Sequence, residues 1–184
     1  MHQDYLIAKV DPGLLNDYVR HSIYDLTSQI LSIDEERSYV VRLLMRRCPG
    51  EERQLIERFA TYLSREIYQE GAILWRQGAK SDCAKLLVSG DLVATLENEA
   101  GTWEAVSVGS VIGESGLVER QNRNSTVTAR VESVLYSLSI QSWELMKEND
   151  PKCANLLYAI TIRYLMLRVQ HCSNRIFETR CLPV

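Results

Sequence analysis

The chain of 184 residues has few of the residues that build metal sites and disulfide frameworks. It contains three histidines, His2, His21 and His171, and five cysteines that lie far apart, with no C-x-x-C pair. An odd number of scattered cysteines argues against a disulfide framework and against a zinc site. We therefore expect no metal, and we expect a reducing, cytoplasmic setting.

Long apolar runs and an excess of basic charge are also missing. No stretch approaches the roughly 18 apolar residues of a membrane span. The opening MHQDYLIAKVD has no basic region followed by an apolar core, so it does not resemble a secretory signal. The formal net charge of −3 argues against non-specific binding of nucleic acid. The length fits one domain with a helical extension.

Helical spacing of apolar residues occurs toward both ends of the chain. It predicts helices over residues 12–31, 34–47 and 50–60, a short helix over 141–149 and a long helix that begins at Pro151. The expected start signals of these helices are the prolines Pro12, Pro49 and Pro151 and the capping residue Ser139.

Between Tyr62 and Ser139 the pattern changes to short alternating runs bounded by glycines. The run LLVSGDLVATLE (86–97) predicts a hairpin, and STVTARV (125–131) and VLYSLS (134–139) predict two more strands. Short strands at this spacing are typical of a sandwich or barrel. The fold class expected is α+β, mainly β, with a β-roll over 62–139.

Two segments carry a resemblance to a known family. The run REIYQEGAILWRQGAKSDCAKLLVSGDLVATL (65–96) resembles the opening strands of cyclic-nucleotide-binding domains, and GESGLVERQNRNSTVTA (113–129) resembles their phosphate-binding cassette. The resemblance implies a double-stranded β-helix, a jelly-roll-like β-roll with N-terminal helices and C-terminal lid helices. It divides the chain into a helical lead-in (1–47), a cyclic-nucleotide-binding-like domain (48–172) and a tail (173–184).

The cassette resemblance also implies a set of ligand-binding residues. A short helical turn over 114–120 would direct free N–H groups at a phosphate, and an arginine fork would bind its oxygens. In the family, the matching glutamate accepts the ribose 2′-hydroxyl. The residues implied are Gly113, Glu114, Ser115, Gly116, Arg123, Asn124 and Ser125.

Three features of this cassette depart from the family pattern or complicate it. Gly116 stands where the family prefers Ala or Ser, and Asn124-Ser125 stand where it prefers a smaller pair. Arg120 lies close to Arg123, and only the nine-residue spacing from Glu114 selects Arg123. In the long C-terminal helix, Tyr164 is a candidate for stacking on the purine, and packing against the roll is the alternative.

Two functions follow from the sequence. The first is a non-catalytic regulatory module that senses cAMP or cGMP and moves its C-terminal helices. The second is an interaction or scaffold domain without a ligand. Its terminal helices would dock either a different partner or another copy of the chain, as a homodimer through the C-terminal helices, along Cys153, Leu156, Leu157, Ile160 and Tyr164. An enzyme is not expected, because no histidine lies within the roll to hold a metal or to activate a nucleophile.

A narrower resemblance concerns the C-terminal part of the chain. The run RYLMLRVQHCSNRIFETRCLPV (163–184) resembles the tail of SulP-type anion transporters from microbial eukaryotes. It implies that residues 1–47 are a linker from a STAS domain, and that the chain is the cytoplasmic part of a sulfate or anion transporter.

Overall fold

The computed structural model describes residues 33–96 and 103–180, and in the last helix it describes side chains as far as residue 166 and at 169 and 170. The expected helix over 12–31 lies outside the described residues. In chain order the elements are α3 (Ile33–Arg47), α4 (Arg53–Thr61), β1 (Ser64–Tyr68), β2 (Ile73–Trp75), β3 (Cys83–Ser89), β4 (Leu92–Thr95), β5 (Trp103–Val106), β6 (Val111–Ile112), α5 (Glu114–Glu119), β7 (Thr126–Ala129), β8 (Ser133–Ser139), α6 (Ile140–Asn149) and α7 (Pro151–Arg180).

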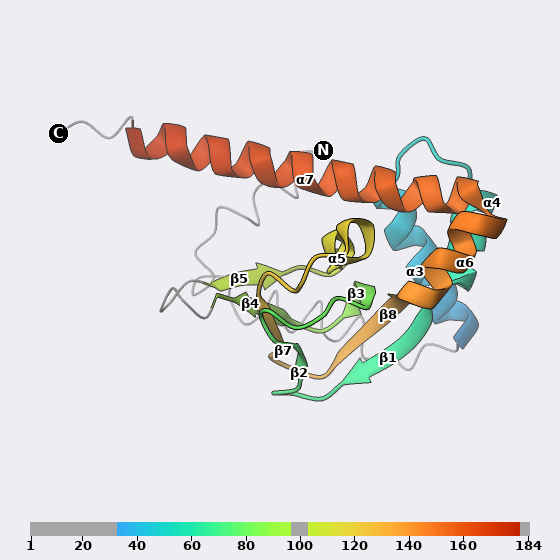
Figure 1. Cartoon of the computed structure of the whole chain (residues 1–184), viewed down its shortest axis with the longest axis horizontal. Helices are drawn as coiled ribbons and strands as arrows, with labels where there is room; N and C mark the ends of the chain where they lie inside the picture. The colour runs from blue at the N-terminus through green and yellow to red at the C-terminus, as the bar shows by residue number, and fades with distance from the viewer. Residues whose placement is uncertain (1–32, 97–102, 181–184) are drawn as a thin grey trace. The chain divides into compact units, whose positions relative to one another are not determined.

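The strands form two four-stranded sheets, one in the order β1-β8-β3-β6 and the other in the order β2-β7-β4-β5. All the strand pairs are antiparallel. Helices precede and follow the roll, and α5 is inserted between β6 and β7 (Figure 1). This arrangement confirms the expected α+β fold with a β-roll.

The predicted hairpin over 86–97 is wrong. Strands β3 and β4 follow one another in the chain but belong to different sheets, and each pairs with other strands. The turn between them crosses from one sheet to the other at Gly90, whose φ is +104°. A Cβ at Gly90 would lie 2.6 Å from the Cα of Ser133, so the crossing requires glycine. Alternation within a strand does not tell which strand it pairs with, and this is why the sequence pattern misled.

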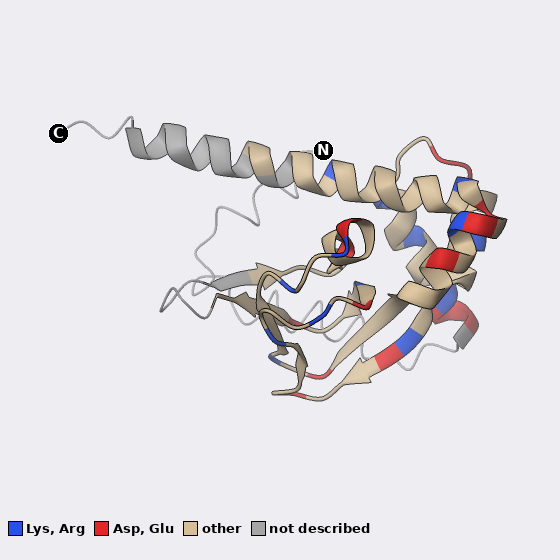
Figure 2. Ribbon diagram, viewed as in Figure 1, with Lys and Arg blue, Asp and Glu red and all other residues tan. Residues whose placement is uncertain are grey.

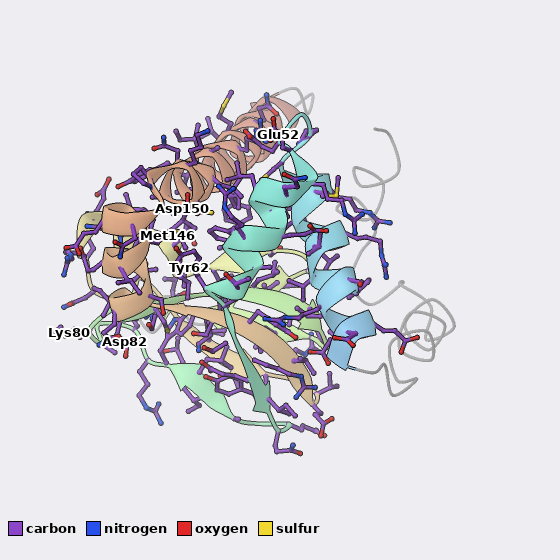
Figure 3. All side chains as sticks on the ribbon, turned by 90° about the vertical axis from the view of Figure 1, so that its right-hand side faces the viewer. Glu52, Tyr62, Lys80, Asp82, Met146 and Asp150 are labelled. Carbon is purple, nitrogen blue, oxygen red and sulfur yellow. The ribbon has the colours of Figure 1, made fainter. Side chains whose placement is uncertain are left out.

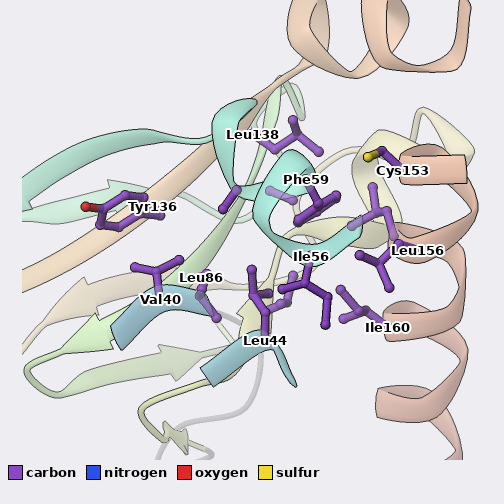
Figure 4. Packing of buried hydrophobic residues seen from close by; sticks show 14 of the residues in the cluster. Val40, Leu44, Ile56, Phe59, Leu86, Tyr136, Leu138, Cys153, Leu156 and Ile160 are labelled. Atoms are coloured by element: carbon purple, nitrogen blue, oxygen red, sulfur yellow. The ribbon is translucent and has the colours of Figure 1, made fainter. Parts of the chain in front are cut away.

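Buried residues form two clusters, one on each face of the β1-β8-β3-β6 sheet. The inter-sheet core joins both sheets through residues such as Leu87, Leu92, Val127 and Leu135. The helix–sheet core packs α3, α4, α6 and α7 against the outer face of β3 and β8 (Figure 4). Each fully buried aliphatic side chain contributes roughly 1.5–3 kcal/mol, so both faces of this sheet are held by burial.

The labelled residues of the helix–sheet core come from helices distant in sequence. Val40 and Leu44 of α3, Ile56 of α4 and Ile160 of α7 lie in one cluster with Leu86 of the sheet (Figure 4). The expected division of the chain between residues 47 and 48 stays a prediction.

Two expected helix starts are confirmed and one is wrong. The Ser139 side chain accepts a hydrogen bond from the Ser142 N–H and caps α6, and α7 begins at Pro151 with the Asp150 carboxylate accepting from the Cys153 N–H at 3.3 Å. The helix expected from Pro49 begins later, at Arg53. Gly50 has a φ of +95°, which ends any helical path from Pro49 and forms a turn instead.

The face of α7 that was expected to dock a partner is buried within the chain. Cys153, Leu156, Leu157 and Ile160 are at most 3% exposed, because they pack on the roll and on α4. Tyr164 is partly buried. The predicted interface along these residues is therefore wrong, since the domain itself covers them.

A different face of α7 carries exposed apolar side chains. We call it the outer stripe, and its members are 37–63% exposed: Tyr158, Ile162, Leu165, Met166 and Val169. At 100° per residue it lies on the opposite side of the helix, roughly 170° around from the buried face of Cys153, Leu156, Leu157 and Ile160. Among the described residues, no helix has the length and apolar content needed to cross a membrane.

Candidate functional site

Arg123 is the centre of the candidate site and points into the protein. Its side chain is only 2% exposed. Its backbone is fixed to the loop after β2, because the Arg123 N–H donates to the Ala79 carbonyl and the Gly78 N–H donates to the Arg123 carbonyl, both at 2.8 Å. The loop therefore holds the arginine at the level of the first residues of β3.

Arg120 has the opposite orientation. It terminates α5 in a left-handed conformation with a φ of +59°. Its side chain is 61% exposed and forms an ion pair with Glu144 of α6. The two arginines that were ambiguous in the sequence are thus distinct in the fold, and only Arg123 has its guanidinium in the interior.

The guanidinium of Arg123 stacks on the ring of Trp75, with its central carbon 3.9 Å from the ring centroid. At this distance an aromatic ring attracts a cation through its quadrupole. Trp75 ends β2, and the pairing of β2 with β7 is irregular between Ile73 and Trp75. Such an irregularity can re-aim a side chain, and here the ring lies against the inter-sheet core.

The hydrogen bonds that the guanidinium donates to oxygen atoms are long, and its third in-plane contact is to a sulfur atom, which is a weak acceptor. Nη1 donates to the Gly113 carbonyl at 3.4 Å, and Nη2 donates to Asp82 Oδ1 at 3.3 Å and to Cys83 Sγ at 3.2 Å. Strong charge-assisted bonds are about 2.7–2.9 Å long. The Nε atom is buried and has no partner. The donors of this arginine are therefore only weakly used by the protein.

The charge of Arg123 is poorly compensated. Burial raises the pKa of the Cys83 thiol, against the opposing effect of Lys85 and Arg123, so the thiol is neutral at ordinary pH. The side chain of Asp82 is 73% exposed, so water screens much of its attraction for the guanidinium. A buried cation whose ion pair is with a largely exposed carboxylate is a favourable place for an anion.

The start of α5 lies beside this guanidinium. Gly113 precedes the helix with a φ of +74°, and a Cβ there would lie 2.2 Å from Nη1 of Arg123. Glu114, the first residue of the helix, is 6% exposed. The fold thus brings Gly113 and Arg123 into contact, with the Glu114 carboxylate buried next to them in the chain.

Gly116 also fits closely against a neighbouring side chain. A Cβ at this position would lie 2.1 Å from Ser81 Oγ and 2.2 Å from Ser81 Cβ, so the Ser81 side chain fills the space above it. The Ser81 hydroxyl is buried and has no hydrogen-bond partner. This packing contact therefore explains the glycine that stands where the family prefers alanine or serine.

The remaining expected residues are less enclosed. Asn124 is exposed, and Ser115 and Ser125 are half-buried. Trp75, Ser81, Asp82 and Cys83 were not expected as site residues. They lie about forty residues before Arg123 in the chain, and no local spacing links them to it, so only the fold shows them.

An open hollow of about 690 Å³ lies next to the loop that holds Arg123. We call it the rim hollow, and it is lined by Lys80 and Asp82 of that loop, by Arg120, and by Glu144, Leu145 and Glu148 of α6. Figure 3 shows Lys80 and Asp82 near the lower end of α6. Acidic and basic residues alternate along this helix (Figure 2). Among the described residues, no cluster of side chains could hold a metal ion.

Comparison with known families identifies this roll. Residues 65–150 match the family model of the cyclic nucleotide-binding domain. The part of the chain that holds the roll, α5 and α6 therefore belongs to the cyclic nucleotide-binding domain family, as its cassette indicated. The comparison with curated proteins gave no match.

Solved structures share the fold at low sequence identity. A cyclic nucleotide-binding domain from Methylobacillus flagellatus has 16% identity and a TM-score of 0.70 over 82% of this chain and 87% of that one. The catabolite activator protein of Thermus thermophilus has 20% identity and a TM-score of 0.57 over 74% and 64%. The regulatory domain of Toxoplasma gondii PKA with cAMP has 23% identity and a TM-score of 0.55 over 68% and 49%. These matches give no support for the SulP-type resemblance, which stays a prediction.

Proposed function

We propose that the chain is a non-catalytic regulatory module that binds cAMP or cGMP with the phosphate at Arg123. The observation that carries the proposal is the buried guanidinium with an unpartnered Nε, two long hydrogen bonds to oxygen and one contact to a weakly accepting sulfur. A cyclic phosphate has one negative charge and offers oxygens to several donors at once. It would replace weak contacts by charge-assisted ones.

The other cassette residues have roles that follow from this placement. The α5 backbone at Ser115 and Gly116 would donate to the phosphate, and Glu114 would accept the ribose 2′-hydroxyl. A sugar hydroxyl between the carboxylate and the phosphate avoids direct repulsion between the two negative charges. Asn124 and Ser125 follow the arginine at the edge of the site, and Tyr164 stays a candidate for stacking on the base.

A route from the site to the C-terminal helices supports a regulatory output. Helix α5 begins at the site and lies against both β3 and α7. A ligand that binds one position of α5 better than another would shift the equilibrium between positions of α7. Cytoplasmic location is part of the proposal, and the free thiols of Cys48, Cys83 and Cys153 support it.

Calorimetry with cAMP and cGMP tests the proposal. We expect the wild-type chain to bind at least one of them and Arg123→Ala to weaken binding by roughly 10- to 100-fold, since a hydrogen bond to a charged group contributes about 1.5–3 kcal/mol. Arg120→Ala is the matched control, because it removes an exposed arginine three residues away, and its affinity should be unchanged. Equal affinities of wild type and Arg123→Ala would remove the cassette from the function.

A second candidate function is supported by the outer stripe of α7. Five exposed apolar side chains on one helix face form a contiguous surface of the kind that marks interaction sites. In this function the domain binds a second copy of the chain through α7, with or without a nucleotide. The two functions are compatible, because the stripe and Arg123 lie on separate elements.

A further inference from the structure

We infer that Trp75 is a positioning residue of the anion site, which holds the plane of the Arg123 guanidinium so that its donors face an incoming phosphate. The inference rests on the proposed function and deepens it. Nothing in the cassette pattern includes this residue. The evidence is the stack itself, at 3.9 Å between the guanidinium carbon and the ring centroid.

Stacking acts on one part of the guanidinium only. The ring covers a flat face of the group, whereas the five N–H donors lie in its plane. The stack therefore leaves the edges available to acceptors in that plane. Trp75 can fix the orientation of Arg123 without occupying the donors that a phosphate needs.

The described in-plane contacts of this side chain are weak. The hydrogen bonds to the Gly113 carbonyl and to Asp82 are 3.4 Å and 3.3 Å long, the Cys83 sulfur at 3.2 Å is a weak acceptor, and Nε has no partner. A free arginine side chain loses rotamer entropy when it is fixed. Stacking on Trp75 meets that cost before any ligand arrives, which is the basis of preorganisation.

Gly113 completes the arrangement. A Cβ at this position would lie 2.2 Å from Nη1 of Arg123 and 3.2 Å from Cη2 of Trp75. The glycine backbone therefore fits against the edges of both groups, and any side chain would separate them. A tryptophan that only filled the core would not require this fit to the arginine.

The test compares Trp75→Phe and Trp75→Leu by calorimetry with the cyclic nucleotide that the wild type binds best. Phenylalanine keeps an aromatic face, so its affinity should stay within about threefold of wild type. Leucine fills the core but cannot stack, and its affinity should fall about tenfold, as expected for a desolvated cation–π contact. Trp143→Phe, at a buried tryptophan in α6, is the control and should leave affinity unchanged.

A double-mutant cycle of binding affinities separates the effect of Trp75 on the orientation of Arg123 from its effect on core packing. In an Arg123→Lys background, Trp75→Leu should no longer change affinity, because the ammonium has no plane to orient. Thermal unfolding of each variant shows whether the fold is retained. Equal affinity of Trp75→Leu and wild type, or an equal loss in both backgrounds, would overturn the inference and leave the proposed function intact. Failure of the wild type to bind either nucleotide would overturn both.

Discussion

Among single residues, Lys85 has the most unusual environment. It lies in the middle of β3 and is 4% exposed. Its ammonium donates to Glu66 Oε2 at 2.5 Å and to Ser137 Oγ at 3.1 Å, and the Tyr68 hydroxyl donates to the same carboxylate oxygen at 2.6 Å. Neighbouring strands supply these groups, so the buried cation is both paired and hydrogen-bonded, as a buried charge requires.

This network predicts that part of the free energy of unfolding depends on pH in the acid range. Burial acts to raise the pKa of Glu66, but donation by Lys85 and Tyr68 outweighs it, and the pKa lies below its usual range. A lowered folded-state pKa stabilises the fold above the unfolded pKa of about 4.3. The contribution is lost as the pH falls through the folded value.

We therefore expect Glu66→Gln to be less stable than wild type at pH 7 and to lose less stability on acidification from about pH 5 to pH 3. Thermal unfolding across this pH range measures both effects. Glu70→Gln, at an exposed glutamate in the following turn, is the control. Parallel pH profiles of wild type and Glu66→Gln would show that the network does not stabilise the fold.

At the scale of elements, α5 and the loop before β3 are fitted to each other. The loop supplies Ser81, which fills the space above Gly116, and it also supplies Asp82, which contacts Arg123. Side chains at 81 and 116 therefore exclude each other. The loop and the helix should shift together whenever either one moves.

We expect Gly116→Ala to destabilise the fold by roughly 1–3 kcal/mol, the usual cost of overpacking. Adding Ser81→Gly to it should recover part of the loss, because it empties the space that the new methyl needs. Urea denaturation of both single variants and the double variant gives the coupling. Ser115→Ala in the same helix should have a small effect. Additive losses in the double variant would mean that Ser81 and Gly116 do not share this space.

Several elements were predictable because their signals are local. Ser139 caps its own helix, Pro151 begins the next one, and the Gly-Glu pair at 113–114 opens α5. Sheet membership was not predictable for 86–97, because the partners of β3 and β4 are strands distant in sequence. The residues of the site also divide into those with a local sequence signal and those without one. Arg123 could be chosen by its spacing from Glu114, whereas Trp75 and Asp82 reach it only through the folding of β2 and β3.

The predicted interface along the buried face of α7 was wrong for a related reason. The outer stripe of the same helix bears instead on how whole molecules could associate. Apolar residues occur on more than one face of α7, so helical spacing alone did not tell which face the domain covers. Among the α7 side chains that the structure describes, only Lys152 and Arg163 are charged, and the rest of that part of the helix is coloured tan (Figure 2). The five exposed side chains of the outer stripe form an apolar patch on the order of a few hundred Å² per copy. Two such surfaces reach only the lower limit of specific interfaces.

We expect a weak, concentration-dependent dimer of the wild-type chain. Ile162→Lys should make it monomeric, because it puts a charge in the middle of the stripe. Gln170→Lys, at an exposed polar residue of the same helix, should leave the association unchanged. Sedimentation velocity from low to high micromolar concentration measures the association of each variant. A wild type that stays monomeric throughout would exclude the second copy as the occupant of the stripe.

The contact between Arg123 and Asp82 links the interior of the roll to its outer surface. Asp82 also lines the rim hollow, where Lys80 and Arg120 face Glu144 and Glu148. An anion that takes over Nη2 would release the Asp82 carboxylate, and the electrostatic potential of the hollow would become more negative. Binding of an anion at Arg123 would then change the electrostatic potential at the surface of the domain, without any displacement of a helix.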